Sequence, residues 1–254
     1  MPPMRRRPDE MSASAPDRDL VLEAEMQRLN DRIVSDIRRA EAAGRGVKLL
    51  VVGTGRCGTA SAQRALNAVG IGCGHEDVYG PWGYVDETGL EADASWLAVP
   101  YLPFVNARII HLARDPVDVA NSFLSIGFFD AAPANVYKDF ARRWAPLTGD
   151  GVDDAFRWWL EWNRMCERHA AARFRVDEMP ALAAFALSAL GRDTSAVDAA
   201  SGLMGERHNR KAHEKSARGK AGIEDISDAG LRDAVAVMAT RYGFGGQASD
   251  GRAA

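Results

Sequence analysis

The chain has 254 residues, of which 46% are hydrophobic and 26% are charged, and its formal net charge is -3. This composition is ordinary for a soluble globular protein and excludes collagen-like, disordered and coiled-coil chains. The sequence has no apolar run of the about 18 residues that a membrane-crossing helix needs, and a general nucleic-acid-binding protein would be strongly basic. We therefore expect neither a membrane nor a nucleic acid among its partners.

The N-terminus and the cysteines favour a cytoplasmic protein. Residues 1–18 are polar and rich in proline, and the three consecutive arginines among them precede no apolar stretch. They are predicted to form a disordered tail rather than a signal peptide. The three cysteines, Cys57, Cys73 and Cys166, form no C-x-x-C pair, which indicates reduced thiols rather than a disulfide framework or a zinc site.

Residues 19–46 are predicted to form an N-terminal helical arm. Apolar residues recur at steps of three and four from Leu22 to Ile37, as on one face of an amphipathic helix. Gly44 and Gly46 end the pattern. We expect this helix to pack on its own domain, and the alternative is a homodimer formed through residues 19–43.

An α/β domain is predicted over residues 47–245, followed by a flexible tail at 246–254. Leu49–Val52 is a fully apolar run that leads into a Gly-rich turn, as a buried parallel strand does. Further strands are predicted at 108–112 and 173–176, and helices are predicted after 58 and 115 and at 153–172, 178–190 and 228–242. This alternation indicates a doubly wound, mostly parallel sheet flanked by helices, of the P-loop NTPase-like kind.

The Gly-rich turn G-T-G-R-C-G-T-A-S at 53–61 is the most informative segment. Its three glycines let successive backbone N–H groups point inward, and together with the start of the next helix they form a concave anion site. Arg56 adds a cation, and the hydroxyls of Thr59 and Ser61 add donors. The Walker pattern G-x-x-x-x-G-K-[ST] is met except that Thr59 replaces the lysine, which a kinase of the usual design needs.

A second strand-to-helix turn carries the sequence Arg114-Asp115-Pro116. Asp115 is a favourable N-cap and Pro116 a favourable first helical residue, so a helix is predicted to begin there. Ser122 follows Arg114 by eight residues on this helix. Arg114 and Ser122 can therefore contact one phosphate from two sides.

These two turns resemble the phosphate-binding motifs of sulfotransferases that use 3′-phosphoadenosine 5′-phosphosulfate (PAPS). The first is similar to the 5′-phosphosulfate loop of the branch with arginine in that loop, which includes tyrosylprotein and many bacterial carbohydrate sulfotransferases. The second is similar to the 3′-phosphate motif, and Phe174–Glu178 is weakly similar to a later strand of the family. The resemblance implies that Arg114 and Ser122 hold the 3′-phosphate and that no metal is required. It also implies that the 5′-phosphosulfate is held by Gly55, Arg56, Cys57, Gly58, Thr59, Ala60 and Ser61.

A late basic segment and a short acidic stretch complete the expected site. Residues 204–220 contain six basic and two acidic residues, which is typical of a solvated charge run. The family resemblance instead assigns Arg218 and Lys220 to a loop that closes over the nucleotide. The stretch at 71–77 is similar to the C-G-E segment of the tyrosylprotein branch, in which glutamate is the base.

We expect Glu76 to be the catalytic base with His75 beside it, because either side chain can take a proton. Arg56 is expected to neutralise charge on the leaving oxygen. His111 stands in an apolar strand and is predicted to be a packed core histidine instead.

The predicted function is transfer of a sulfuryl group from PAPS to a hydroxyl of a carbohydrate or small-molecule acceptor. Four aromatic residues between the two phosphate motifs are expected to border the sulfate, namely Tyr79, Trp82, Tyr84 and Trp96. The tryptophans of the 153–172 helix could line the same cleft or belong to the core. The alternative functions are a P-loop nucleotide kinase with a displaced cation, which would bind ATP with Mg²⁺, and a non-catalytic nucleotide-binding module.

Overall fold

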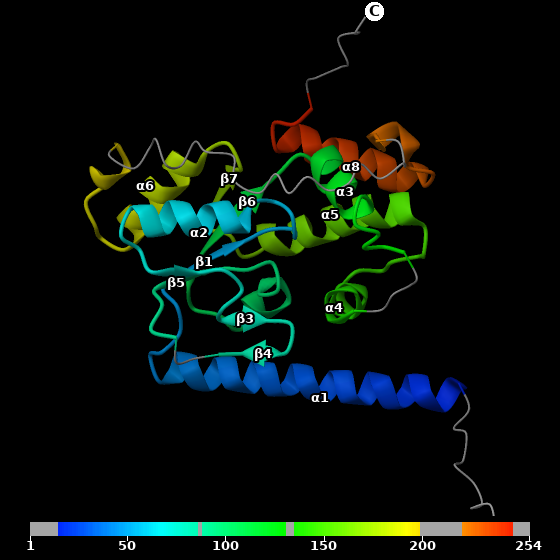
Figure 1. The fold of residues 1–254 in the computed structure, drawn as a ribbon, viewed down its shortest axis with the longest axis horizontal. Helices are drawn as coiled ribbons and strands as arrows, with labels where there is room; N and C mark the ends of the chain where they lie inside the picture. Colours follow the sequence, from blue (N-terminus) through cyan, green and yellow to red (C-terminus); the bar gives the residue numbers. More distant parts are fainter. Residues whose placement is uncertain (1–14, 86–87, 131–134, 199–219, 246–254) are drawn as a thin grey trace, which may run out of the picture.

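The computed structural model describes residues 15–85, 88–130, 135–198 and 220–245 and places a five-stranded parallel sheet at the centre of the molecule (Figure 1). The strand order is β2-β5-β1-β6-β7, and every neighbouring pair is parallel. The strands are β1 (Leu49–Val52), β2 (Cys73–Gly74), β5 (Ala92–Ala94), β6 (Arg108–Ala113) and β7 (Ala172–Arg175). A separate antiparallel hairpin is formed by β3 (Tyr79–Gly80) and β4 (Gly83–Tyr84). The α/β class predicted from the sequence is confirmed.

Helices cover both faces of the sheet because every second side chain of a strand points to the same face. Leu49 and Val51 pack into a core that includes residues of α2 and α6. Leu50 and Val52 pack into a second core that includes residues of α1, α3, α4, α5, α8 and η1. The helices on the two faces are α1 (Ala15–Ala42), α2 (Thr59–Ala68), η1 (Val99–Phe104), α3 (Pro116–Leu124), α4 (Val136–Trp144), α5 (Gly151–Glu167), α6 (Met179–Ala189), η2 (Ile223–Asp225) and α8 (Ala229–Arg241).

Helix α1 packs along its own domain, beneath the β3–β4 hairpin in Figure 1, and inserts Ile33 and Ile37 into the core. Its bounds differ from the predicted 19–46. The helix also includes residues 15–18, which the sequence predicts to belong to the tail, and Pro16 stands in its first turn, where proline is tolerated.

The other end of α1 is set by Gly44. Gly44 has a φ of 67°, and Arg45 N–H donates to Ala40 O over 2.9 Å, which is a Schellman ending. Among the described residues no helix is both long and apolar enough to cross a membrane. The predicted tails at 1–14 and 246–254 lie outside the described residues.

Local capping signals position the helices that follow the strands. Asp115 accepts hydrogen bonds from Val117 N–H and Asp118 N–H at the start of α3, as predicted. Helix α5 begins at Gly151 rather than at 153, because Asp150 caps it, and it ends at Glu167 rather than at 172, because the chain must turn into β7. The predicted strand at 173–176 begins one residue earlier, at Ala172.

Candidate functional site

The candidate site lies at the carboxyl ends of β1 and β6, which are neighbours in the centre of the sheet. The chain leaves β1 through α2 toward β2 on one side, and it leaves β6 toward β7 on the other side. In parallel α/β sheets, ligands bind in the crevice where the connections diverge in this way. The two turns singled out in the sequence, at 53–58 and 114–116, both lie at this point.

The first turn is packed too tightly to admit a side chain at Gly53. A Cβ atom there would lie 2.2 Å from Leu112 O of β6 and 2.7 Å from Cys57 Sγ. Gly58, the N-cap of α2, has a φ of 109°, a conformation that favours glycine. The turn is therefore fixed against β6 before any ligand is considered.

Arg56, Arg114 and Ser122 lie together, although the resemblance assigned Arg56 to the 5′-phosphosulfate and Arg114 with Ser122 to the 3′-phosphate. Arg56 Nε donates to Ser122 Oγ over 2.7 Å, and Arg114 Nη1 donates to Arg56 O over 3.1 Å. The other side of the Arg114 guanidinium pairs with Asp118 at 2.9 Å. One hydrogen-bonded group thus connects the Gly-rich turn to α3.

Two guanidinium groups lie close together at this point. Partial burial and the neighbouring charge of Arg114 lower the pKa of Arg56. Asp118, which pairs with Arg114, is largely exposed, with 61% of its side chain accessible. A pair of arginines at a helix start is an arrangement that attracts an anion with several oxygen atoms.

Not every group of the turn faces outward. Thr59 Oγ1 lies 3.1 Å from His75 Nε2, so this hydroxyl contacts the histidine. The N–H groups of Cys57 and Ser61 donate to Thr54 O and Gly58 O inside the protein. The Cys57 thiol is fully buried, and burial raises its pKa to about 12, so it is no nucleophile. Gly55 and Ala60 complete the turn and the first turn of α2.

His75 and Glu76 lie next to the start of α2 through the Thr59 contact. His75 Nε2 is 3.9 Å from Glu76 Oε1. Burial lowers the pKa of His75, so its ring is neutral at pH 7. Burial, with a contribution from the Asp93 charge, raises the pKa of Glu76 from 4.5 to about 7. A carboxyl group with such a pKa can accept and release a proton near neutral pH.

Asp93 and Trp96 support Glu76, and the sequence reasoning did not identify either role. Asp93, in β5, is fully buried and accepts hydrogen bonds from Asp77 N–H at 3.3 Å and Tyr79 N–H at 3.2 Å. Burial raises the pKa of Asp93 to about 6. The Trp96 side chain lies close enough to Glu76 to oppose the rise in the Glu76 pKa, and it lies 3.6 Å from the Cβ position of Gly55. Asp93 stands between two alanines that are flanked by Glu91 and Ser95, so no local pattern in the sequence marked its role.

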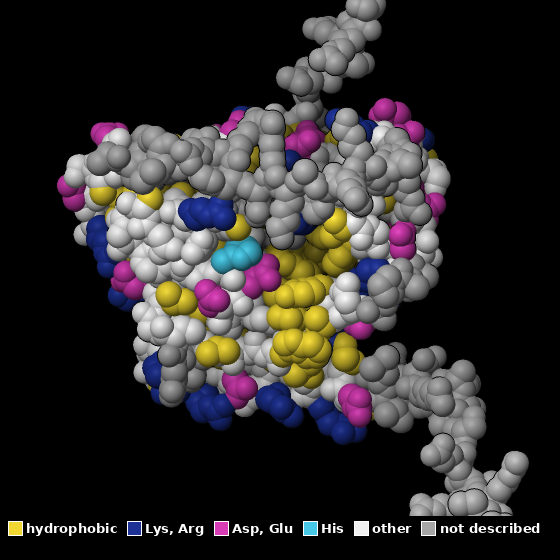
Figure 2. Space-filling model, viewed as in Figure 1, with side chains coloured by type: hydrophobic (Ala, Val, Ile, Leu, Met, Phe, Trp, Pro, Cys, Tyr) yellow, Lys and Arg dark blue, Asp and Glu magenta, His cyan; other side chains and the backbone are white. Residues whose placement is uncertain are grey.

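The aromatic residues divide between the core and the surface. Tyr79 and Trp96 are buried, whereas Trp82 is 74% exposed. Trp158, Trp159 and Trp162 are completely buried, which confirms the core interpretation. On the face shown in Figure 2, hydrophobic side chains gather between the β3–β4 hairpin and α4.

His111 is the packed core histidine that was predicted. It is completely buried, one ring nitrogen lies 2.7 Å from Asn163 Oδ1, and burial lowers its pKa to about 4.

The late basic segment is described only at its end, where Lys220 is exposed. Arg218 lies outside the described residues. Asn121 of α3 accepts from Ala221 N–H over 2.9 Å and donates to Ala221 O over 2.8 Å. These two hydrogen bonds hold Ala221 against α3. Lys220 precedes Ala221 in the chain and therefore lies beside α3, close to Ser122.

Comparison of the chain with protein-family models, with curated proteins and with solved structures gave no match. Across the described ranges, no group of three or more His, Cys, Asp or Glu side chains is placed to hold a metal ion.

Proposed function

We propose that the chain is a P-loop-type sulfotransferase that transfers a sulfuryl group from PAPS to a hydroxyl of a carbohydrate or small molecule. The observation that carries the proposal is the group formed by Arg56, Arg114 and Ser122 where the connections of the sheet diverge. Two arginines that lie close together, one on each turn, suit a nucleotide that carries several anionic groups. The position of Lys220 beside α3 supports an additional cationic contact.

PAPS supplies a sulfuryl group whose bond to phosphate breaks as the acceptor oxygen bonds to sulfur. Glu76 would take the acceptor proton, because its raised pKa matches this task near neutral pH. Arg56 would neutralise the charge that develops on the leaving phosphate oxygen. His75 would hold the Thr59 hydroxyl and keep the 71–77 stretch against α2.

Two features make a nucleotide kinase the weaker alternative. Thr59 stands where a kinase has its phosphate-binding lysine, and its hydroxyl contacts His75. Asp93, on the strand next to β1, directs its carboxylate to backbone N–H groups rather than outward. The phosphate-binding cation of this chain is an arginine within the turn.

Calorimetric titration with adenosine 3′,5′-bisphosphate in EDTA tests the nucleotide site. The wild-type chain is expected to bind, and Arg114→Ala is expected to weaken binding at least about tenfold, as for the loss of a charged hydrogen-bond donor. Arg108→Ala is the matched control, because Arg108 is exposed at the opposite end of the same strand. It should leave the affinity unchanged.

The proposal fails if the bisphosphate does not bind, or if Arg114→Ala and Arg108→Ala bind it equally well. Tighter binding of ATP with Mg²⁺ than of the bisphosphate would favour the kinase. A radiolabelled-sulfate transfer assay over sugars and phenols then distinguishes an enzyme from a non-catalytic binding module, which would transfer to no acceptor.

A further inference from the structure

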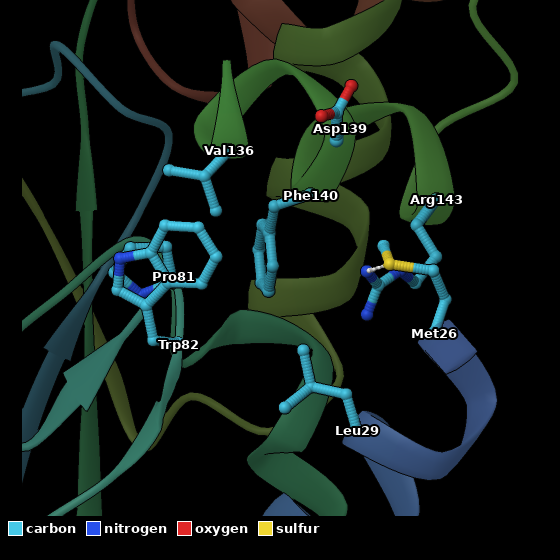
Figure 3. Close-up of a pocket in the computed structure, with 8 residues that line it drawn as sticks. All are labelled: Met26, Leu29, Pro81, Trp82, Val136, Asp139, Phe140 and Arg143. Carbon is cyan, nitrogen blue, oxygen red and sulfur yellow. Dashed lines mark hydrogen bonds between the residues drawn. The ribbon is translucent and has the colours of Figure 1, made fainter. Parts of the chain in front are cut away.

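A pocket of about 160 Å³ lies between α1, the turn of the β3–β4 hairpin and α4. Leu29 of α1 forms its floor in the view of Figure 3, and the rings of Trp82 and Phe140 form two of its walls. Trp82 is exposed, although large aromatic side chains are usually covered. A flat apolar ligand between these walls would cover it.

Arg143 brings a positive charge whose hydrogen-bond partners are neutral to the far side of this pocket. Its Nη1 donates to Asn30 Oδ1 over 2.8 Å and its Nη2 to Met26 Sδ over 2.8 Å, and both partners are neutral. Its Nε is buried and has no hydrogen-bond partner. Among the described residues no carboxylate lies within ion-pair distance of this guanidinium.

Asp139 forms no direct ion pair with Arg143, although its charge opposes the lowering of the Arg143 pKa that burial causes. Asp139 also lines the pocket, but its carboxylate points away from Leu29 and Met26 in Figure 3 and lies 3.8 Å from Arg142. A half-buried guanidinium without a direct ion-pair partner can form charged hydrogen bonds with an anion. A ligand carboxylate would therefore gain affinity at Arg143.

The pocket is connected to the proposed base by a single aromatic ring. Phe140 packs edge-on against Trp96 with 5.6 Å between ring centroids, and the Trp96 side chain lies close enough to Glu76 to affect its pKa. Tyr137, on the same helix as Phe140, also lies next to Trp96, with 6.1 Å between their ring centroids. A molecule held between Trp82 and Phe140 therefore lies two aromatic neighbours away from Glu76, with the Trp96 ring between them.

We propose that this pocket binds the acceptor, and that the acceptor is a hydroxylated aromatic carboxylate. Its ring lies between Trp82 and Phe140, its carboxylate pairs with Arg143, and its hydroxyl is directed toward Glu76. The acceptor role rests on the proposed sulfotransferase function, whereas binding of the ring and the carboxylate does not.

The test uses two probes of nearly the same shape, 3-(4-hydroxyphenyl)propanoate and its amide. The first ends in a charged carboxylate and the second in a neutral amide group. Ligand-observed NMR titrations of the full chain, without nucleotide, give the two dissociation constants. The wild type is expected to bind the propanoate at least about fivefold more tightly than the amide. Arg143→Gln should remove this preference, and Trp82→Ala should weaken both probes at least about fivefold.

Arg142→Gln is the matched control, because Arg142 is the neighbouring arginine of α4 and does not line the pocket. It should leave both affinities unchanged. Arg143→Lys keeps the charge and should retain the preference, which provides a second variant if Arg143→Gln does not fold.

The proposal is overturned if neither probe binds, if the wild type binds both equally, or if Arg142→Gln removes the preference as Arg143→Gln does. Because these titrations contain no nucleotide, probe binding without binding of adenosine 3′,5′-bisphosphate would reject the sulfotransferase and keep the aromatic-carboxylate site. Sulfation of the propanoate in the presence of PAPS would support both proposals.

Discussion

Glu76 combines an unusual backbone conformation with an unusual acidity. Its φ of 62° lies in the left-handed region, which non-glycine residues seldom adopt, and which costs on the order of 1 kcal/mol or more. Such strain persists only where the surroundings enforce it. Here the backbone on both sides of Glu76 is held by hydrogen bonds from His75 N–H to Asp77 Oδ2 and from Asp77 N–H to Asp93 Oδ1. Strain and a raised pKa at one residue are typical of a functional position.

The raised pKa of Glu76 makes a prediction about stability. The folded state binds this proton more tightly than the unfolded state, so the contribution of Glu76 to stability falls as the pH rises from 4.5 to about 7. Glu76→Gln changes the free energy of unfolding by one amount at pH 4 and by another at pH 8. We expect the change at pH 8 to be more stabilising than the change at pH 4 by on the order of 2 kcal/mol. Urea denaturation at the two pH values measures this difference.

Glu25→Gln serves as the control, since Glu25 is an exposed glutamate of α1. An identical effect of Glu76→Gln at both pH values would contradict the assigned burial.

In the transfer assay, Glu76→Gln is expected to lower the rate about a hundredfold with unchanged nucleotide affinity. Full activity would reject Glu76 as the base.

At the scale of elements, the Gly-rich turn depends on the strand beside it. Gly53→Ala would place its Cβ 2.2 Å from the backbone oxygen of Leu112, which cannot move without disturbing β6. We expect a loss of about 2–4 kcal/mol in the free energy of unfolding, as for an overpacked core position. Gly72→Ala is the control, because a Cβ there meets nothing within 4 Å. Equal urea midpoints for the two variants would contradict the close packing.

The elements that the sequence predicted are those with a strong local signal. Strands β1 and β6 are apolar runs followed by turns, and α3 has its Asp-Pro start. Strand β5 has three residues with an acid at its centre, so neither hydrophobicity nor alternation indicates it. The site follows the same rule. Arg56, Arg114 and Ser122 belong to recognisable turns, whereas the support of Glu76 by Asp93 and Trp96 depends on tertiary contacts.

At the scale of the whole molecule, α1 is a structural part of one of the two cores. Ile37 is completely buried, whereas Val34 packs only partly against the same core. Ile37→Ala is expected to lower the free energy of unfolding by about 3 kcal/mol, and Val34→Ala by less. Thermal or urea denaturation of the two variants checks the order. Equal, small losses would mean that α1 is not needed for the stability of the domain.

A homodimer through residues 19–43 remains a prediction. Ile33 and Ile37 are buried against the helix's own domain, so a partner copy would have to contact other faces of α1. Sedimentation of the wild type over a range of concentrations tests it.

The contact between Gly53 and Leu112 O also concerns the order in which the chain acquires its site during folding. Strand β1 pairs with β5 and β6, and Leu49 aligns with Ala92 on one side and with Arg108 on the other. Contacts over such sequence separations form slowly, because long loops must close first. A nascent chain that ends before β6 would contain the complete Gly-rich turn but lack the strand that supports it. Anion binding would then require the assembled central sheet. During refolding, we therefore expect ligand binding to appear at the rate of the slowest strand pairing and not at the rate at which α2 forms.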